Sequence, residues 1–395
     1  MELRYTFRLE PGPGARASLA RVFGCARVVW NDALVARKAA FAAGQPFPRT
    51  AELSKLLITQ AKRTTQRAWL AEVSSVPLQQ VLRDQDRAWR AFFDSLKGSR
   101  NGAKVGVPAV KSRKDSSQSV RFTANAGWKI TPAGKLSLPK VGHIPVRWSR
   151  QLPCVPSSVT VIKDGAGRYF ASFVVRNDAR ADAARFPLVA GDQGIDLGLA
   201  HFAVLADGSR ARSPRFLRRA EKKVRKRHRA FSRKQKGSKN REKARVRLAR
   251  AHAGVADARK DFHHQLSTKL IRENQSVTVE TLNVRGLSRG ALSKAVHDAG
   301  WGQFLRMLDY KAKRYGREFT RVARAFPSSQ LCSACGHRDG PKPLNVRTWT
   351  CSECGTLHDR DWNAGQNLRQ EGRRIRTKAL QTAPPTPGPG ALTSE

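Results

Sequence analysis

The stretch "CGTLHDRDWNAGQNL", residues 354–368, brings together a metal-binding turn, two acids and the start of a predicted helix. Cys354 and Gly355 end a CxxC turn, Asp359 and Asp361 follow, and an apolar, amide-bearing run comes next. The whole chain has 75 Lys and Arg but only 30 Asp and Glu. Two aspartates directly behind a CxxC turn are therefore candidates for a specific chemical role.

The cysteine of this stretch is the last of four with the spacing C-x2-C-x15-C-x2-C. The set consists of Cys332, Cys335, Cys351 and Cys354, and glycine follows each pair in "CSACG" and "CSECG". Four thiolates at this spacing are typical of tetrahedral zinc. Two disulfides are the alternative, which a reducing compartment disfavours. We predict a closed, structural zinc site in a ribbon over residues 329–358, and we interpret the isolated Cys25 and Cys154 as small core residues.

The charge of the chain indicates its partner. With 395 residues, 40% of them hydrophobic, the chain is long enough for several domains with their own cores. A formal net charge of +45 would repel itself in a compact protein unless a polyanion neutralised it. Nucleic acid is the expected partner, and a merely solvated basic surface is the alternative. Because neither a long apolar segment nor a secretory signal is present, we expect an intracellular protein without membrane association.

The N-terminal half predicts a β-domain interrupted by helices. "RYTFRLEP" alternates with the period of a strand, and apolar residues then recur at helical spacing over residues 15–98. After a basic loop at residues 99–118, short β-like runs follow at regular intervals, from "SVRFTA" to "RYFASFVVR". We predict a β-barrel over residues 1–14 and 99–185, with a helical bundle over 15–98 inserted into it.

The C-terminal half alternates strands with long helices. "GIDLGLAHFAVLADGS" predicts two strands around a turn, and "SVTVETL" and "EFTRVAR" predict two more. Residues 209–250 hold 20 Lys and Arg, which indicates one or two basic helices with a break at "KGSKN", and a further helix runs to about Asn274. "WGQFLRMLDYKAKRYG" predicts an amphipathic helix with a glycine stop. Residues 373–395, which end in "APPTPGPGALTSE", are predicted to be disordered.

Three acids stand out by position. Asp196 and Glu280 each end an apolar strand, and Asp361 lies at a helix start. Taken singly, each could be a turn residue or a helix cap. Taken together, they could converge on one point, where carboxylate oxygens would hold two Mg²⁺ or Mn²⁺ ions. Two such ions would clamp the attacking and leaving oxygens of a phosphodiester cleavage.

The order of these motifs resembles the TnpB (OrfB) family of transposon-encoded proteins, relatives of the type V CRISPR nucleases. The resemblance is carried by "GIDLGL", "VETLNVRGL", "LDYKAKRYG", "PSSQLCSACG", "CSECG" and "HDRDWNAGQN", and it extends over residues 3–372. It implies a multidomain α+β fold, in which a β-barrel wedge domain with a helical recognition insert precedes an RNase H-like (RuvC) α/β nuclease domain. That domain would comprise residues 190–328 and 359–372, with the zinc ribbon inserted before its last acid.

The resemblance also implies an activity. Members use an RNA from the transposon end as a guide and cut double-stranded DNA beside a short flanking motif. Carried over to this chain, Asp196, Glu280 and Asp361 would be the three catalytic acids. Asp359 is the weaker alternative to Asp361, and would otherwise support the site or cap the helix. We expect a cytoplasmic, prokaryotic protein that is nucleoid-associated when on DNA, as a monomer or weak dimer.

Two groups of side chains are candidates for nucleic-acid contacts. Amide and guanidinium groups suit base edges, so Gln79, Gln80 and Arg83 could read the flanking motif. A plain solvated helix face is the alternative there. The guide RNA and its heteroduplex would be held through their backbones by the basic helices, and the candidates are Lys222, Lys223, Arg225, Lys226, Arg229 and Lys234.

The chain departs from the family pattern at three places. Thr281 stands where the family often has Asp, "NAGQNL" replaces a commoner Ala-Ala form, and "VPAVKSRK" lacks the aromatic residue of a usual Pro-Arg-Phe-Lys loop. None removes one of the three acids. Three other functions remain open from the residues: a guide-dependent DNA-binding protein that represses without cutting, a plain RNA-binding protein, and a transposase that joins DNA ends itself.

Overall fold

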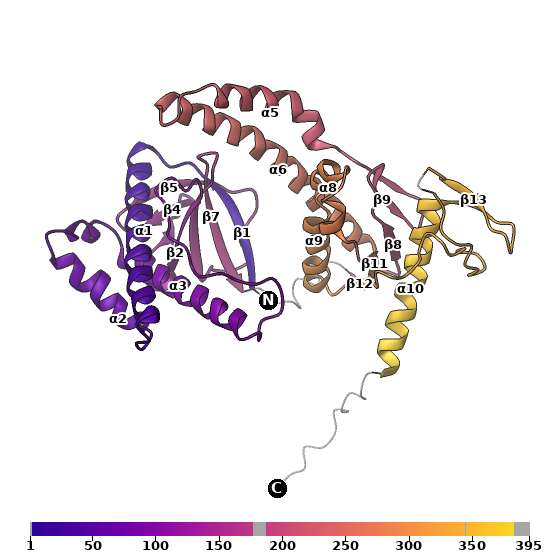
Figure 1. Cartoon of the computed structure of the whole chain (residues 1–395), viewed down its shortest axis with the longest axis horizontal. Coiled ribbons are helices and arrows are strands. Elements are labelled where there is room, and N and C mark those ends of the chain that lie inside the picture. Colours follow the sequence, from indigo (N-terminus) through magenta and orange to yellow (C-terminus); the bar gives the residue numbers. More distant parts are fainter. Residues whose placement is uncertain (1, 177–186, 344, 383–395) are drawn as a thin grey trace, which may run out of the picture. The chain divides into compact units, whose positions relative to one another are not determined.

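The computed structural model describes residues 2–176, 187–343 and 345–382, and divides into two compact units (Figure 1). Unit 1 comprises residues 1–177 and 237–250, and unit 2 comprises residues 178–236 and 251–395. The predicted domain boundary at residue 185 lies outside the described residues. Within the described residues, no helix combines the length and apolarity needed to cross a bilayer.

Unit 1 is built on a seven-stranded antiparallel sheet with the order β2-β6-β7-β1-β5-β4-β3. The strands are β1 (Glu2–Leu9), β2 (Gln118–Thr123), β3 (Lys129–Ile130), β4 (Lys135–Leu138), β5 (Gly142–Arg147), β6 (Ser158–Lys163) and β7 (Tyr169–Arg176). As predicted, the opening strand β1 completes the sheet. It pairs with β7 along its whole length on one side and with β5 at its C-terminal end on the other.

The predicted β-barrel is wrong in one respect, because the sheet is open. Strands β2 and β3 form its two edges and pair with each other nowhere in the described residues. Only two residues of β1, Arg8 and Leu9, pair with β5, so β5 joins the rest of the sheet through a short ladder. Inward residues of β1 alternate with exposed ones, and the concave side is filled by helices rather than by closure of the sheet.

The helical insert covers the sheet of unit 1. It consists of α1 (Pro13–Ala42), α2 (Thr50–Ser54), a π-helical turn (Lys55–Gln60), 3₁₀ turns (Ala61–Arg63, Ala68–Glu72) and α3 (Ser75–Leu96), and a further 3₁₀ turn (Ala124–Ala126) follows β2. Pro13 at the first helical position suits the start of α1. Six residues of the predicted apolar stripe are buried as expected, namely Leu19, Val22, Phe23, Ala26, Val29 and Trp30.

The basic loop before β2 is fixed on α1. The Trp30 indole donates to the carbonyl of Ala109, and the Lys111 ammonium lies 3.8 Å from the centre of the Trp30 ring. Asn31 exchanges two hydrogen bonds with the backbone of Lys111. The loop therefore obtains an aromatic contact from α1, although "VPAVKSRK" carries no aromatic residue of its own.

Unit 2 contains a five-stranded mixed sheet with the order β10-β9-β8-β11-β12. Its strands are β8 (Asp192–Asp196), β9 (His201–Leu205), β10 (Arg210–Arg212), β11 (Ser276–Glu280) and β12 (Glu318–Val322). The first three are joined antiparallel, whereas β8, β11 and β12 run parallel. Four of these strands were predicted, and the three-residue β10 was not.

Helices connect and follow these strands in the chain. They are α5 (Phe216–Ser232), α6 (Lys239–Glu273), α7 (Val284–Leu287), α8 (Ser293–Ala299), α9 (Trp301–Arg314) and α10 (Arg360–Thr382), and a two-stranded hairpin of β13 (Thr348–Thr350) and β14 (Leu357–Asp359) precedes α10. The predicted break at "KGSKN" separates α5 from α6. The further helix to Asn274 is not separate, because α6 is continuous; its first part belongs with unit 1, where Arg245 donates to the carbonyl of Gly165.

The predicted disordered tail is wrong for residues 373–382, which continue α10. Arg373 and Arg376 form ion pairs with Asp192, and Arg376 also pairs with Glu318 at 3.0 Å. These acids lie on strands far away in the sequence, so the pairs could not be read from local composition. Residues 383–395 lie outside the described part of the chain.

Glycines allow α10 to lie directly on β8 and β11 (Figure 1). A Cβ on Gly194 would overlap the carbonyl oxygen of Gly365, and a Cβ on Gly372 would overlap the Thr278 hydroxyl. Gly365, Leu368 and Gly372 share one face of α10 by their helical spacing, and Leu368 is fully buried. This face fixes where the N-terminal end of α10 meets the sheet.

Adding a methyl group to this interface is expected to destabilise the protein. The variant Gly372→Ala should lower the free energy of unfolding by about 1–3 kcal/mol, because its Cβ lies 2.8 Å from the Thr278 Cβ. The matched control Gly254→Ala on α6 meets no atom within 4 Å and should be neutral or stabilising by up to about 1 kcal/mol. Thermal denaturation of the two variants checks this; equal melting temperatures would contradict the close packing of α10.

A buried lysine gives unit 2 a specific pH dependence. Burial lowers the pKa of Lys311 to about 8, and its ammonium donates to the Ser267 hydroxyl, the Thr268 hydroxyl and the His264 carbonyl. In the unfolded chain the pKa is about 10.4. The unfolded state therefore binds more protons between about pH 8 and 10.4, and stability is lost as the pH falls through this window.

We expect Lys311→Met to melt at a higher temperature than wild type below about pH 8. This advantage should shrink as the pH rises towards 10.4, because the wild-type amine then becomes neutral in both states. Melting temperatures of both proteins across pH 7–10.5 check this. A difference that stays constant over the whole range would show that Lys311 remains charged when buried.

Candidate active site and metal centre

Two of the three predicted acids end adjacent parallel strands. Asp196 is the last residue of β8 and Glu280 the last residue of β11. The preceding residues, Ile195 and Val279, are register partners and fully buried. Neighbouring strands lie about 4.8 Å apart, so the two acids sit side by side at the carboxyl edge of the sheet. Side chains alternate along a strand, which places both acids on the face that carries Gly194 and Thr278 and contacts α10.

The third acid comes from the helix that packs on this face. Asp361 lies in the first turn of α10, four residues before Gly365, and therefore on the side of the helix that faces the sheet. Asp359 has a different position: its carboxylate accepts a hydrogen bond from the Trp362 amide at 2.9 Å and pairs with Arg210 at 2.8 Å. Asp359 thus caps the helix, which is the supporting role predicted for it.

The three carboxylates affect one another electrostatically. Burial raises the pKa of Asp196 well above its ordinary value, and the Glu280 and Asp361 carboxylates raise it further. Burial also raises the pKa of Glu280. Arg347 and Arg360 offset part of this repulsion, and Arg347 forms an ion pair with Asp361 at 3.4 Å. The site is therefore a half-buried acidic centre, in which the two arginines do not fully offset the repulsion between the three carboxylates.

Such a centre suits a divalent cation chemically, because carboxylate oxygens are the ligands that Mg²⁺ prefers. The carboxylates are nevertheless not drawn together to coordination distance. Within the described residues, the four cysteines are the only group whose ligand atoms all lie within 4.8 Å of one another.

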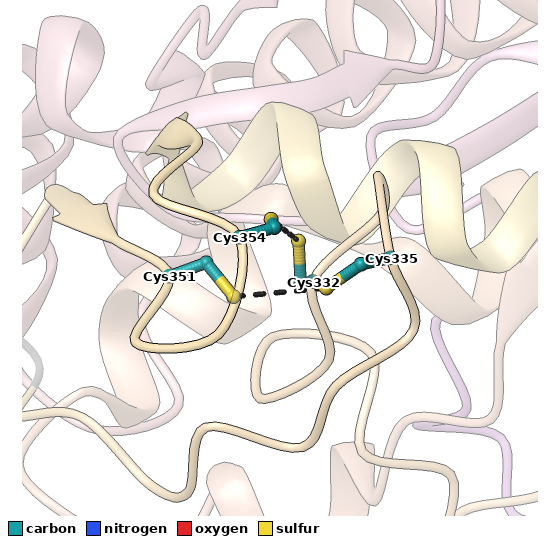
Figure 2. A group of neighbouring side chains, drawn as sticks. All are labelled: Cys332, Cys335, Cys351 and Cys354. Carbon is teal, nitrogen blue, oxygen red and sulfur yellow. Dashed lines mark hydrogen bonds between the residues drawn. The ribbon is translucent and has the colours of Figure 1, made fainter.

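The cysteines form a metal-type cluster (Figure 2). Cys332 and Cys354 have their sulfurs 3.6 Å apart, and those of Cys335 and Cys351 are 3.8 Å apart. Zinc–sulfur bonds of about 2.3 Å in a tetrahedron place sulfurs about 3.8 Å apart. The two knuckles therefore already have the spacing of a Cys₄ site that can hold structural zinc.

A buried histidine and a tryptophan support this cluster. His358 on β14 has its Nε2 3.0 Å from the Cys332 sulfur, and its ring packs on Trp349 of β13. Burial lowers the pKa of His358, so the neutral ring can donate to a thiolate. The Lys342 ammonium lies 3.7 Å from the centre of the same Trp349 ring.

Two asparagines that the sequence interpretation missed attach this cluster to α10. Asn363 exchanges hydrogen bonds with the Leu331 carbonyl and the Ser333 amide, at 2.7 and 2.9 Å. Asn367 donates to the carbonyls of Ser328 and Leu331, each at 2.8 Å. Both side chains are buried. The available signal was their four-residue spacing in "NAGQNL", which puts two amides on one helix face together with Gly365's neighbours Ala364 and Leu368.

The hairpin next to the cluster also positions Arg347, a cation that was not predicted to lie near the acids. Arg360 donates its backbone amide to the Arg347 carbonyl at 2.8 Å and its guanidinium to the Pro343 carbonyl at 2.7 Å. These bonds fix the residue before β13 against the first turn of α10, where Arg347 reaches Asp361. The cysteine cluster and the acidic centre are thus parts of one connected structure.

The residues predicted to contact nucleic acid differ in their exposure to solvent. Arg83 is exposed on α3 and Gln79 is half-buried, but Gln80 is only 4% exposed, which argues against the prediction that it reads base edges. On α5, the five predicted cations are exposed, and Arg225 pairs with Glu221 at 2.9 Å. Lys234 is exposed in the α5–α6 break.

Known protein families match successive parts of the chain. The OrfB_IS605 family, described as "Probable transposase", matches residues 190–291, which include Asp196 and Glu280. The Cas12f1-like TNB domain matches residues 301–368, which include the four cysteines and Asp361. A helix-turn-helix domain matches residues 1–46, a range that contains β1 and α1.

Individual proteins match nearly the whole chain. A protein of Streptomyces pristinaespiralis named "Putative RNA-guided DNA endonuclease" is 42% identical, with 93% of this chain and 89% of that protein aligned. InsQ of Escherichia coli K12, which carries the same descriptive name, is 28% identical over 94% of this chain and 92% of its own length. In fold, the chain is similar to Cas12f1 from a complex with guide RNA and target DNA, with a TM-score of 0.52, 15% identity, and coverage of 90% and 82% of the two chains.

Proposed function

The chain belongs to the TnpB (OrfB) family, and from this premise we propose that it is an RNA-guided DNA endonuclease of a transposon. The observation that carries the proposal is the juxtaposition of Asp196, Glu280 and Asp361 in one half-buried acidic centre, in a chain of net charge +45. A protein that binds polyanions has reason to keep such a centre only where cations neutralise it.

The topology of unit 2 supports an RNase H-like (RuvC) nuclease domain. In the order β10-β9-β8-β11-β12, three antiparallel strands are followed by two that run parallel to the central strand. The ends of the two middle strands carry Asp196 and Glu280, and a helix packed on the same face carries Asp361. Crevices at the carboxyl ends of parallel strands are the usual ligand sites of such sheets.

We propose that Asp196, Glu280 and Asp361 hold two Mg²⁺ or Mn²⁺ ions when substrate is bound. Bound divalent ions supply an activated water and stabilise the charge that develops on the attacking and leaving oxygens. Asp196 would provide a shared carboxylate between its two neighbours, and Asp359 would keep the first turn of α10 in place. The expected products carry a 5′-phosphate and a 3′-hydroxyl, and one site would cut the two strands in turn.

The remaining parts would bind and position nucleic acid. We propose that the exposed cations of α5 hold the guide RNA and its heteroduplex by phosphate contacts, while base pairing supplies sequence specificity. The flanking motif would be read from the helical insert of unit 1, where Arg83 and Gln79 remain candidates. The Cys₄ cluster would hold structural zinc and keep Arg347 against Asp361.

A repressor that binds without cutting is the second candidate, and a strand-joining transposase is the third. A repressor has no use for three mutually repelling, half-buried carboxylates, which lower stability without a cation. A transposase could use the same acids, and strand-transfer products formed without any RNA would identify it.

Sequencing of the RNA that copurifies with the full-length chain tests the guide function. We expect a single abundant RNA that extends from the transposon end into flanking sequence. A heterogeneous mixture of cellular RNAs would contradict a dedicated guide and favour general RNA binding.

A further inference from the structure

Unit 2 contains a cavity of about 530 Å³ that is separate from the three carboxylates. It lies between the turn after β8, the N-terminal part of α5, α6 and α8. Its apolar walls include Phe202, Phe216, Phe262 and Leu292. The Phe216 and Phe262 rings are half-buried and meet edge to face, with centroids 6.0 Å apart. The volume is typical of sites for one small ligand.

The cavity is held open by polar contacts between its walls. The Asp298 carboxylate on α8 accepts hydrogen bonds from the Leu217 amide at 2.8 Å and the Arg218 amide at 3.4 Å, and so caps α5. Further along the same two helices, Lys294 pairs with Glu221 at 2.6 Å. Because α5 and α8 are joined at two points, the space between them is preformed and does not depend on a ligand.

The rim of the cavity is cationic. Arg215 and Arg218 are both exposed and both line it. In the part of the chain that the structure describes, neither guanidinium group has a hydrogen bond or an ion pair. Exposed arginines beside half-buried aromatic rings are the combination with which proteins bind the phosphates and bases of single strands.

The cavity is close to the acidic centre along the chain. Leu199, on its wall, is three residues after Asp196, which limits the separation of their Cα atoms to about 11 Å. That distance corresponds to about three base steps of a duplex, at roughly 3.4 Å each. A strand whose phosphate reaches Asp196 would therefore have its neighbouring nucleotides within a few base steps of Leu199 on the cavity wall.

We propose that this cavity binds one unpaired base of the DNA strand that is cut, stacked against Phe216 and Phe262, with the adjacent phosphates held by Arg215 and Arg218. The proposal deepens the function proposed above and rests on it for the identity of the strand. A free phosphate would need no aromatic walls, and an apolar ligand would need no arginines. Stacking of one base would fix the register of the strand relative to the three acids.

Binding of two single strands of equal length and charge tests the proposal. The full-length chain, purified with the RNA that it carries, is titrated with labelled oligothymidine and with an abasic strand. Phosphate contacts contribute equally to both probes, so the ratio of their dissociation constants reports on bases alone. For wild type we expect the abasic strand to bind about tenfold more weakly.

Two variants should reduce this ratio several-fold: Phe216→Ala removes a stacking ring, and Ala295→Trp fills the cavity from an exposed position on α8. The control Phe41→Ala, at a 53% exposed ring of unit 1, should keep the wild-type ratio. A wild-type ratio near one, or an unchanged ratio in both cavity variants, overturns the proposal. If the wild-type complex showed the expected tenfold ratio of dissociation constants but cut no matched DNA, the nuclease function would be wrong and the proposed base-binding site would still be supported.

Discussion

The variant Asp196→Asn is expected to abolish DNA cleavage while leaving DNA binding intact. In the proposed function Asp196 is the ligand shared by two metal ions, so its loss should remove several kcal/mol of transition-state stabilisation, which corresponds to on the order of 10³-fold or more in rate. Single-turnover cleavage of a matched target, together with a binding assay on the same complex, separates the two effects.

The same variant should be more stable than wild type when no divalent cation is added. Asp196 is half-buried, and the Glu280 and Asp361 carboxylates disfavour its charged form, so its neutral amide isostere removes a repulsive interaction. Added Mg²⁺ should raise the melting temperature of wild type and have little effect on Asp196→Asn, because binding to the folded state alone is stabilising. A variant that melts lower than wild type, and that still responds to Mg²⁺, would contradict the assignment of Asp196. The control Asp309→Asn changes a half-buried acid on α9, which pairs with Lys313 away from the three carboxylates, and should behave as wild type.

The variant Cys351→Ser is expected to remove zinc from the protein and unfold the region around the cluster. Cys351 is buried, and its sulfur lies 3.8 Å from that of Cys335. Structural zinc in small sites contributes roughly 10–16 kcal/mol of apparent binding free energy, far more than the hairpin could supply alone. Metal analysis should find about one zinc per wild-type chain and none in the variant. The control Cys154→Ser should retain the metal, because Cys154 is isolated from the other cysteines. The interpretation of Cys154 as a core residue was wrong, since it is exposed, whereas Cys25 is buried.

This loss should reach the acidic centre. Asn363 and Asn367 hold the first knuckle on α10, and Arg347 extends from the hairpin to Asp361. Cleavage by Cys351→Ser should therefore fall with its zinc content, although all three acids are retained. A variant that lost its zinc but cut DNA at the wild-type rate would show that the cluster and the acids are independent.

Patterns of short range predicted most of the elements correctly. The alternation in β1 and the helical stripe of α1 reflect the burial of one face each, which local sequence records. The positions of Asp196 and Glu280 at strand ends follow from apolar runs that stop at an acid. Each CxxC pair is a local turn that the sequence records, and the spacing of a zinc site predicted that the sulfurs of the two turns meet.

Features that depend on distant partners were not predicted. The open sheet of unit 1 depends on which strands find partners, and its edges β2 and β3 are not marked in the sequence. Ion pairs of Arg373 and Arg376 with Asp192 extend α10 into residues interpreted as a tail. The burial of Gln80 and the contact of Arg347 with Asp361 likewise depend on packing between segments.

The most direct test of the account uses the full-length protein with its copurified RNA, Mg²⁺, and a DNA duplex that matches that RNA beside a library of flanking sequences. We predict cleavage of both strands, confined to matched targets with a particular flanking motif, with 5′-phosphate ends, and absent for Asp196→Asn. Cleavage by Asp196→Asn at the wild-type rate, or stable binding of the matched duplex by wild type without any cleavage, would contradict it.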